Sequence, residues 1–304
     1  MDKSFFKKIF IYISALIPMI FWGISYIWTK IVLKYYHPIT TIFLRLLIST
    51  IILSFVVFIF RNKFSINKKD YKYFFVLAFF EPFCYFIGEN FGIELVSPTV
   101  ASIIISTIPV VTPIFAYFFL KERLTKLNIL GLLISFSGVV IILTTKNSDL
   151  IVSAKGIALL FLSVFSGVGY GITTKKLSLR YSPLTIVYTQ NLIGALYFFP
   201  LFLFFEFDHF INVTPNQELI TSLLQLSIFA STLAFLFITY AIKNLGINRT
   251  NVFTNLIPIV TALFSFLILG KVLALQEIAG IFVVISGLFL SQKRKKSDVV
   301  HEDL

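Results

Sequence analysis

Long runs of apolar residues, separated by short polar stretches, follow one another along the whole sequence. Each run is about 20 residues long, the length that a helix needs to cross the hydrocarbon core of a bilayer. The connecting stretches are too short to hold a soluble domain. The pattern therefore predicts an all-α polytopic membrane protein with ten transmembrane helices. The predicted spans are residues 9–29, 39–60, 71–95, 98–120, 126–145, 154–174, 184–206, 218–241, 250–270 and 275–292.

Composition and charge agree with this pattern and add an orientation. Of the 304 residues, 58% are hydrophobic and 13% are charged, whereas soluble proteins average about 25% charged residues. The net charge of +12 comes from Lys and Arg between the apolar runs, which favours a lipid bilayer over nucleic acid as a partner. A cytoplasmic amino terminus places 20 basic residues on the cytoplasmic side and 5 on the other. Because Lys and Arg concentrate in cytoplasmic loops, we expect a multi-pass protein of the cell (plasma) membrane, in bacteria the inner membrane, with both termini cytoplasmic.

The chain is an internal repeat. A shift of 149 positions aligns spans three to five with spans eight to ten, so that Pro109 matches Pro258, and a shift of 144 aligns Tyr26 with Tyr170. Five spans per copy force the second copy to enter the membrane from the opposite side. Inverted repeats are typical of secondary transporters, whose substrate site lies near the bilayer midplane. The predicted division is a first five-helix repeat at 1–147, a second at 148–292 and a basic cytoplasmic tail at 293–304.

The two copies resemble the EamA family of the drug/metabolite transporter superfamily. The residues that carry the resemblance are Gly23, Thr29, Lys30, Pro38, Arg45, Pro109, the loop 121–125 (KERLT), Gly131 and Gly138. The second copy departs at Lys271, which stands where the first has Glu122. The resemblance implies two inverted five-helix bundles and a central cavity lined mainly by spans 1, 3, 4, 6, 8 and 9, with spans 5 and 10 packed outside.

Polar residues follow one face of several predicted spans. Positions three or four apart share a helix face, and Trp22 and Tyr26 lie on such a face with Ser25 and Thr29. Tyr170 occupies the matching place in the second copy. Because polar groups are costly in hydrocarbon, these faces must contact protein or water. For the serines and threonines, helix packing is the alternative explanation. The amides Gln190, Gln225, Asn251 and Asn255 are the stronger cavity candidates.

Three charged residues lie within predicted spans: Arg45, Glu81 and Glu89. An intramembrane charge costs ~2.5–3.5 kcal/mol even on lenient insertion scales, so each is a functional candidate. One interpretation pairs Arg45 with a carboxylate to hold spans 2 and 3 together. The other leaves Glu89 without a fixed partner, free to carry a proton or to contact a cationic substrate group. The charge is one-sided, since the second copy has Gln190 in place of Arg45 and aliphatic residues in place of both acids.

These residues define the predicted substrate-binding or coupling site. Its members are Glu89, Glu81, Arg45, Trp22, Tyr26, Tyr85, Tyr170, Gln190, Gln225, Asn251 and Asn255. Aromatic rings beside amides and a carboxylate suit a small amphipathic metabolite, such as an amino acid or an amine. We therefore predict a secondary transporter that works by alternating access, and the family resemblance implies export.

Other functions have weaker support. An enzyme needs a metal or nucleophile cluster, but His37, His209 and His301 are expected far apart in loops or the tail. We expect no enzyme activity, cofactor, metal site or catalytic residue. A channel would need a filter loop or rings of charge, which these short loops do not offer. A lipid-carrier flippase and a nucleotide-sugar-like carrier on the same scaffold stay open as alternatives, as does homodimer formation.

Overall fold

The computed structural model describes residues 3–59, 65–120, 126–143, 153–270 and 274–291. The described part is helical, without strands, and six of its helices are long and apolar enough to cross a membrane. Shorter apolar helices, among them Phe253–Leu269, accompany them. The chain is thus an all-α polytopic membrane protein, as predicted. The loop 121–125, Lys271, His301 and the tail 293–304 lie outside the described residues.

Five of the ten predicted spans are single α-helices, and five are divided. The single helices are α1 (Lys3–Val32), α2 (Pro38–Ile59), α7 (Lys126–Leu143), α8 (Ala154–Ser178) and α15 (Leu275–Ser291). The third span consists of η1 (Lys68–Asp70), α3 (Tyr71–Ala78), η2 (Phe79–Cys84) and α4 (Tyr85–Leu95), and the fourth of α5 (Pro98–Ile105) and α6 (Ile108–Leu120). The seventh comprises α9 (Pro183–Leu201), η3 (Phe202–Glu206) and α10 (Phe207–Asn212); the eighth α11 (Gln217–Gln225), η4 (Leu226–Leu233) and α12 (Ala234–Leu245); and the ninth α13 (Ile247–Asn251), η5 (Val252–Leu256) and α14 (Ile257–Leu269).

Proline explains where three of these spans are interrupted. Glu81 has extended backbone angles of φ −147° and ψ 118° immediately before Pro82, because proline has no N–H and disfavours helical angles in the preceding residue. The breaks before α6 and α14 fall just ahead of Pro109 and Pro258. Glu81 and Glu89 both lie in the third predicted span, but they are not on one continuous α-helix, because the helix is broken at Glu81.

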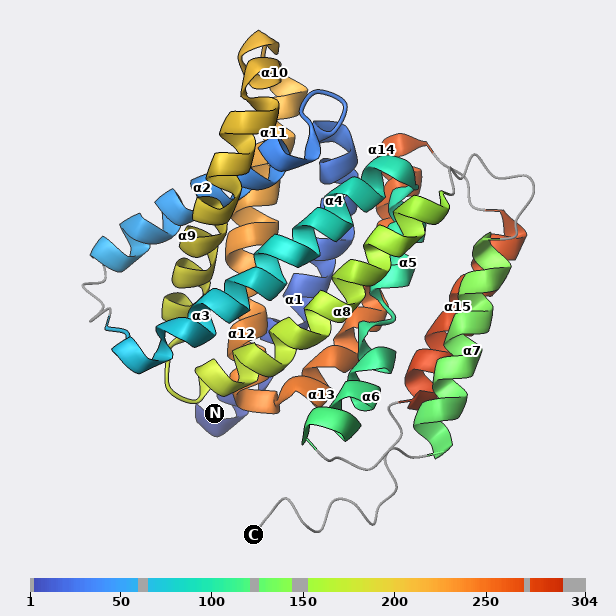
Figure 1. The fold of residues 1–304 in the computed structure, drawn as a ribbon. Helices are drawn as coiled ribbons and strands as arrows, with labels where there is room; N and C mark the ends of the chain where they lie inside the picture. Colours follow the sequence, from blue (N-terminus) through green and yellow to red (C-terminus); the bar gives the residue numbers. More distant parts are fainter. Residues whose placement is uncertain (1–2, 60–64, 121–125, 144–152, 271–273, 292–304) are drawn as a thin grey trace.

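Helices from the two halves interleave. The described start of α1 and end of α15 lie at the same end of the bundle, and α4 packs on α8 and α2 on α9 (Figure 1). Helix α1 contacts α12 and α14 of the second half. Helices α7 and α15 pack mainly against each other at the edge of the bundle (Figure 1), as the family resemblance implied for spans 5 and 10.

Paired glycines explain how α7 and α15 pack. A Cβ atom on Gly138 would lie 2.6 Å from the backbone nitrogen of Val284, and one on Gly287 would lie 2.7 Å from the carbonyl oxygen of Gly131. Both distances are too short for a side chain, so the two backbones are in direct contact. Small residues at close helix contacts are common in membrane bundles.

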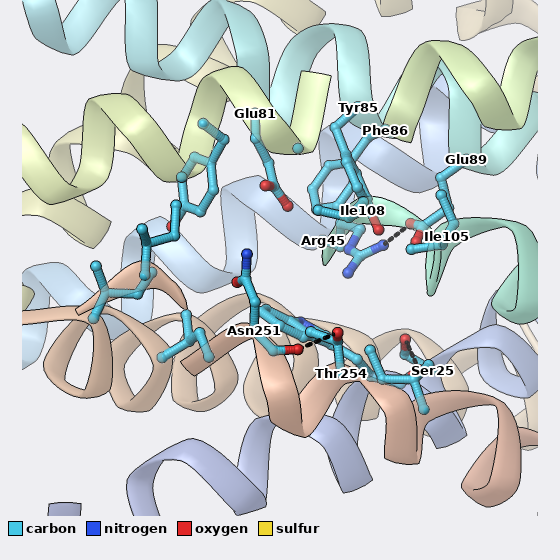
Figure 2. Close-up of a pocket in the computed structure, with 18 residues that line it drawn as sticks. Ser25, Arg45, Glu81, Tyr85, Phe86, Glu89, Ile105, Ile108, Asn251 and Thr254 are labelled. Carbon is cyan, nitrogen blue, oxygen red and sulfur yellow. Dashed lines mark hydrogen bonds and ion pairs between the residues drawn. The ribbon is translucent and has the colours of Figure 1, made fainter. Parts of the chain in front are cut away.

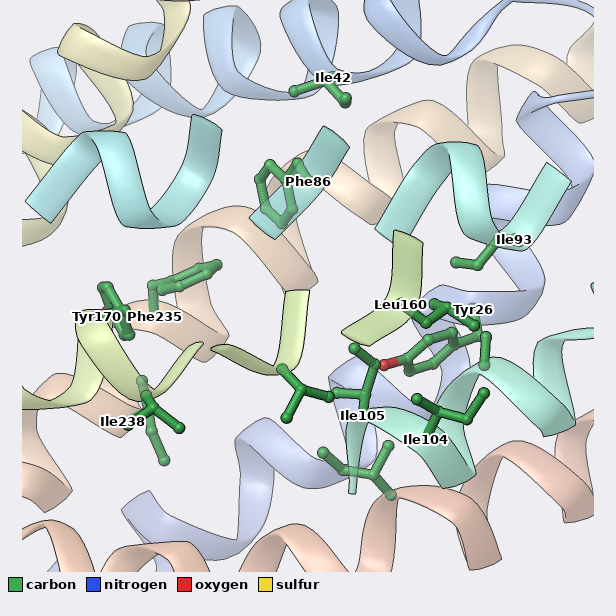
Figure 3. Packing of buried hydrophobic residues seen from close by; sticks show 14 of the residues in the cluster. Tyr26, Ile42, Phe86, Ile93, Ile104, Ile105, Leu160, Tyr170, Phe235 and Ile238 are labelled. Atoms are coloured by element: carbon green, nitrogen blue, oxygen red, sulfur yellow. The ribbon is translucent and has the colours of Figure 1, made fainter. Parts of the chain in front are cut away.

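Aromatic and aliphatic side chains from both halves meet in the core. Phe86 of α4 and Phe235 of α12, which the repeat aligns with each other, have ring centroids 6.4 Å apart (Figure 3). Tyr26 and Tyr170, also aligned by the repeat, are both buried in this cluster. The core therefore lies where the two copies meet, and it surrounds the cavity described next.

Candidate transport cavity

A cavity at the centre of the bundle is lined by seven of the ten spans (Figure 2). Glu81, Tyr85 and Glu89 lie on one wall, and Asn251 and Thr254 lie on the facing wall (Figure 2). The lining includes spans 1, 3, 4, 6, 8 and 9, as the resemblance implied, and Arg45 adds the second span. Seven members of the predicted site line this cavity: Trp22, Arg45, Glu81, Tyr85, Glu89, Tyr170 and Asn251.

Arg45 is fixed from three sides. Its Nε donates to Ser231 Oγ at 2.8 Å, and its guanidinium carbon lies 4.2 Å from the centre of the Phe86 ring. Its Nη1 lies 3.9 Å from Glu89 Oε2. Both side chains of this ion pair are more than nine-tenths buried. The pairing of Arg45 with a carboxylate, left open by the sequence, is thus present between α2 and α4.

The two carboxylates have different surroundings. Glu89 lies beside Arg45 and near the hydroxyl groups of Tyr26 and Tyr85. Its presumed lack of a fixed partner is therefore wrong. Glu81 is equally buried, yet within the described part of the chain its carboxylate forms no hydrogen bond and no ion pair. Among the charged groups of the cavity, Glu81 is the one left to contact a solute.

A polar network behind Arg45 was missed by the sequence analysis. The Nδ2 of Asn191 donates to Ser49 Oγ at 2.8 Å and to the carbonyl oxygen of Ser231 at 2.9 Å. Ser49 Oγ is 2.6 Å from Thr232 Oγ1. Ser231 and Thr232 belong to the π-helical segment η4, a form of helix that is frequent at functional sites. The one signal in the sequence was Asn191 beside Gln190.

Aromatic side chains cover the apolar part of the cavity. The indole nitrogen of Trp22 donates to the carbonyl oxygen of Ala230 at 3.2 Å, again within η4. The Phe235 ring, behind the cavity wall, is 5.3 Å from Trp22 and 6.0 Å from Tyr170 between ring centroids. The cavity therefore offers aromatic faces next to its charged groups.

Four predicted site residues do not line the cavity. Tyr26 is buried near Glu89, and Gln190 is buried near Tyr170, with neither of its amide atoms hydrogen-bonded within the described residues. Gln225 is half-buried at the end of α11. Asn255 is buried in a separate, apolar pocket beside α15. Helical spacing alone had grouped Asn255 with Asn251, but the narrower 3₁₀ turn of η5 separates them.

The histidines differ from the prediction as well. The rings of His37 and His209, expected far apart, have centroids 4.1 Å apart. The loop after α1 and helix α10 meet at one end of the bundle, and sequence separation gives no sign of this. Within the described residues, no group of three or more His, Cys, Asp or Glu side chains is arranged to hold a metal ion.

Two inverted halves around a buried polar cavity define the class of polytopic membrane transporters. The sequence matches the EamA-like transporter family over residues 9–144 and again over 154–292. The chain belongs to this family, and its general role is that of a membrane transporter.

Known relatives agree with this assignment without naming a substrate. An "Uncharacterized transporter" of Archaeoglobus fulgidus is 27% identical, over 93% of this chain and 99% of the relative. The "Uncharacterized transporter YetK" of Bacillus subtilis is 26% identical, over 95% and 89% of the two chains. One solved crystal structure superposes with a TM-score of 0.70 at 13% identity, covering 92% of this chain and 97% of that chain. At this identity the likeness shows the fold alone.

Proposed function

We propose that the protein is a secondary transporter for a small amphipathic solute with a positively charged amino group, such as an amine or an amino acid. The solute occupies the central cavity, and alternating access exposes the cavity to one side of the membrane at a time. The observation that carries this proposal is the buried Glu81 carboxylate, which lines the cavity without a partner among the described residues.

The charge balance of the cavity supports a cationic group. Arg45 is held beside Glu89, so this pair offsets its own charges, while Glu81 adds a further carboxylate. A buried carboxylate is stabilised strongly when a cation arrives to hydrogen-bond with it. An amino group fits this requirement.

The aromatic lining supports an apolar part in the same solute. Trp22, Tyr85 and Tyr170 line the cavity together with the carboxylates of Glu81 and Glu89. Ring faces attract ammonium groups and pack against hydrocarbon.

The remaining features of the proposal follow from charge distribution and family resemblance. We place the protein in the cell membrane with both termini in the cytoplasm, because basic residues concentrate on that side. Export is the direction that the resemblance implies. The proposed partners are the solute and the lipid bilayer, with no cofactor and no enzyme activity.

Uptake into proteoliposomes tests the proposal. A panel of radiolabelled amines, amino acids and neutral analogues is compared for the unaltered protein and Glu81→Gln. Losing a hydrogen bond to a charged group costs about 1.5–3 kcal/mol, so the half-saturating concentration of the transported amine should rise roughly 10- to 100-fold.

Glu94→Gln is the matched control, since Glu94 is an exposed acid at the end of the same span. It should transport as the unaltered protein does. Equal uptake by Glu81→Gln and the unaltered protein, or a preference of the unaltered protein for neutral analogues, would refute the proposed role of Glu81.

A further inference from the structure

Two clusters of polar side chains join the halves at opposite ends of the bundle. At one end, Asp70 at the start of α3 contacts Arg180 and Tyr181, which follow α8. At the other end, Glu218 at the start of α11 contacts Lys34 and Tyr35, which follow α1. We name these the Asp70 latch and the Glu218 latch. Figure 1 shows that α3 and α11 begin at opposite ends of the molecule.

The two latches have the same chemistry at corresponding ends of the repeats, with their residues displaced by one or two positions from the shifts of 144 and 149. Leu33-Lys34-Tyr35 follows the first span as Leu179-Arg180-Tyr181 follows the sixth. Each acid follows an asparagine that caps a helix start: Asn67 Oδ1 accepts from the backbone of Lys69, and Asn216 Oδ1 from that of Leu219. The duplication therefore placed one latch at each face of the membrane.

The bonds within each latch combine a tyrosine and a cation on one carboxylate. Tyr181 donates its hydroxyl to Asp70 Oδ2 at 2.7 Å, and Arg180 Nη1 lies 3.1 Å from Oδ1. In the other latch, the Tyr35 hydroxyl donates to Glu218 Oε2 at 2.6 Å, and Lys34 Nζ lies 3.4 Å from Oε1.

Each latch connects one half of the molecule to the other. The Asp70 latch joins the third span to the sixth, and the Glu218 latch joins the first span to the eighth. These four spans all contribute to the cavity lining. Alternating access moves the halves relative to each other around the site. Opening the cavity toward either face must therefore strain the latch at that face.

We propose that the two latches are the opposing gates of the transport cycle, each stabilising closure of its own face. This inference rests on the proposed function. Both latches are formed in this structure, and each opens only when its face opens. Because ion pairs near the surface are weak, the latches bias the conformational equilibrium and let it reverse.

The two latches differ in strength, so the proposal predicts which face of the cavity is held closed more firmly. The Asp70 side chain is 7% exposed, whereas the Glu218 side chain is 47% exposed. Tyr181 also accepts from the backbone nitrogen of Asn67 at 3.2 Å, and its carbonyl oxygen accepts from Lys243 Nζ at 3.3 Å. The Asp70 latch should therefore hold its face, which is also the face at which α1 begins, more firmly than the Glu218 latch holds the other.

The accessibility of a cysteine in the cavity measures how often the cavity is open to each face, and it requires no substrate. The single cysteine is replaced by Cys84→Ser, and Ser25→Cys places a reporter in the cavity lining. A membrane-impermeant maleimide is applied to right-side-out and inside-out vesicles, whose orientation is read from a second reporter near the start of α1. Tyr181→Phe and Tyr35→Phe then remove one hydroxyl from each latch with little change of shape.

We expect opposite shifts. Tyr181→Phe should raise the labelling rate roughly tenfold from the face at which α1 begins, and Tyr35→Phe should raise it roughly threefold from the other face, as the loss of one hydrogen bond to a charged group predicts. Asp70→Asn and Glu218→Gln should act in the same directions as the tyrosine variants. The inference would be overturned if the variants of both latches raised the labelling rate from the same face. It would also be overturned if the variants of neither latch raised the labelling rate.

A second measurement separates this test from the proposed function. Thermal unfolding and gel filtration identify any variant that does not fold, and such a variant is replaced by Lys34→Gln or Arg180→Gln in the matching latch. If no amine is transported but the labelling shifts are opposite, the gating role of the latches is supported and the proposed substrate class is refuted. If amines are transported without these shifts, only the gating role is refuted.

Discussion

The two halves of the cavity surround equivalent tyrosines with different chemistry. Tyr26 of the first half lies near Glu89 and Tyr85, and Arg45 is paired with the same Glu89. Its counterpart Tyr170 lies near Thr174, Gln190 and Thr239 of the second half, all of them uncharged, and the charged group that acts on it, Glu81, belongs to the first half. The duplication thus preserved the buried tyrosine while charge was kept in one half alone.

This difference gives the cavity a polarity. In the second half, the buried hydroxyl of Tyr170 and the amide of Gln190 have no hydrogen-bond partner among the described residues. Buried polar atoms without partners are costly, and water or a polar group of a solute would satisfy them. A solute with one charged and one neutral polar end would therefore bind in a single orientation, with its charge toward the first half.

The largest expected effect comes from making the first half resemble the second. Arg45→Gln copies the residue at the equivalent position, Gln190, and leaves the acids of the cavity without their cation. Removing one partner of a buried ion pair costs about 3–5 kcal/mol. We expect a large drop in thermal stability in detergent and loss of uptake in proteoliposomes. Gln190→Leu, at the equivalent site, should change stability by about 1 kcal/mol or less, because its amide is unbonded.

A double variant distinguishes charge balance from packing. Arg45→Gln combined with Glu89→Gln removes both members of the ion pair and should recover most of the stability lost in Arg45→Gln alone. An unrecovered double variant would mean that the contact of Arg45 with Phe86 and Ser231 carries the stability instead.

A smaller effect is expected from the network that holds Arg45 in place. Asn191 aligns with Leu46 of the first half, so Asn191→Leu makes these positions alike. It removes the two hydrogen bonds that Asn191 donates to Ser49 and Ser231. The free energy of unfolding, measured by thermal unfolding, should fall by about 1–3 kcal/mol. Uptake should fall in parallel because Ser231, which binds Arg45, loses a partner. Asn244→Leu, at an exposed site bonded only within its own helix, should change stability by less than about 0.5 kcal/mol.

Hydrophobic patterning predicted the spans and the repeat because both depend on sequence alone. Apolar run length is fixed by bilayer thickness, and Pro109 and Pro258 recur at one spacing in both copies. The central cavity and the outer position of α7 and α15 were reached through the family resemblance. Among the site residues, the intramembrane charges were found because charge within an apolar run is conspicuous.

The details of the site depended on tertiary contacts that spacing does not contain. Asn191 is one amide among several in the sequence, and its role appears only when α9 meets η4. Asn255 lies three residues beyond Val252, where a 3₁₀ turn replaces the expected α-helix and takes the side chain out of the cavity. His37 and His209 meet although they are far apart in the chain. The sequence therefore did not predict where helices are locally irregular or which distant spans contact each other.

The smallest effect concerns the contact of α14 with α1. Thr261 Oγ1 donates to the carbonyl oxygen of Gly23 and to that of Ile257, both at 2.9 Å. Among the described residues, its repeat equivalent Thr112 bonds only within its own helix, to the carbonyl oxygen of Ile108. Thr261→Val should therefore cost about 0.6 kcal/mol more than Thr112→Val, the average found for hydrogen bonds between membrane helices.

Both threonines are buried, and both variants lose a hydroxyl group. The difference between their losses of stability therefore measures the hydrogen bond to Gly23 alone. Unfolding in mixed micelles, repeated until the error is below this difference, measures it. Equal losses in the two variants would mean that α14 is held against α1 by packing alone, at the point where a Cβ atom added to Gly23 would lie 2.6 Å from Val260 Cβ. Gly23→Ala would then be the more damaging change, because a methyl group there meets Val260 directly.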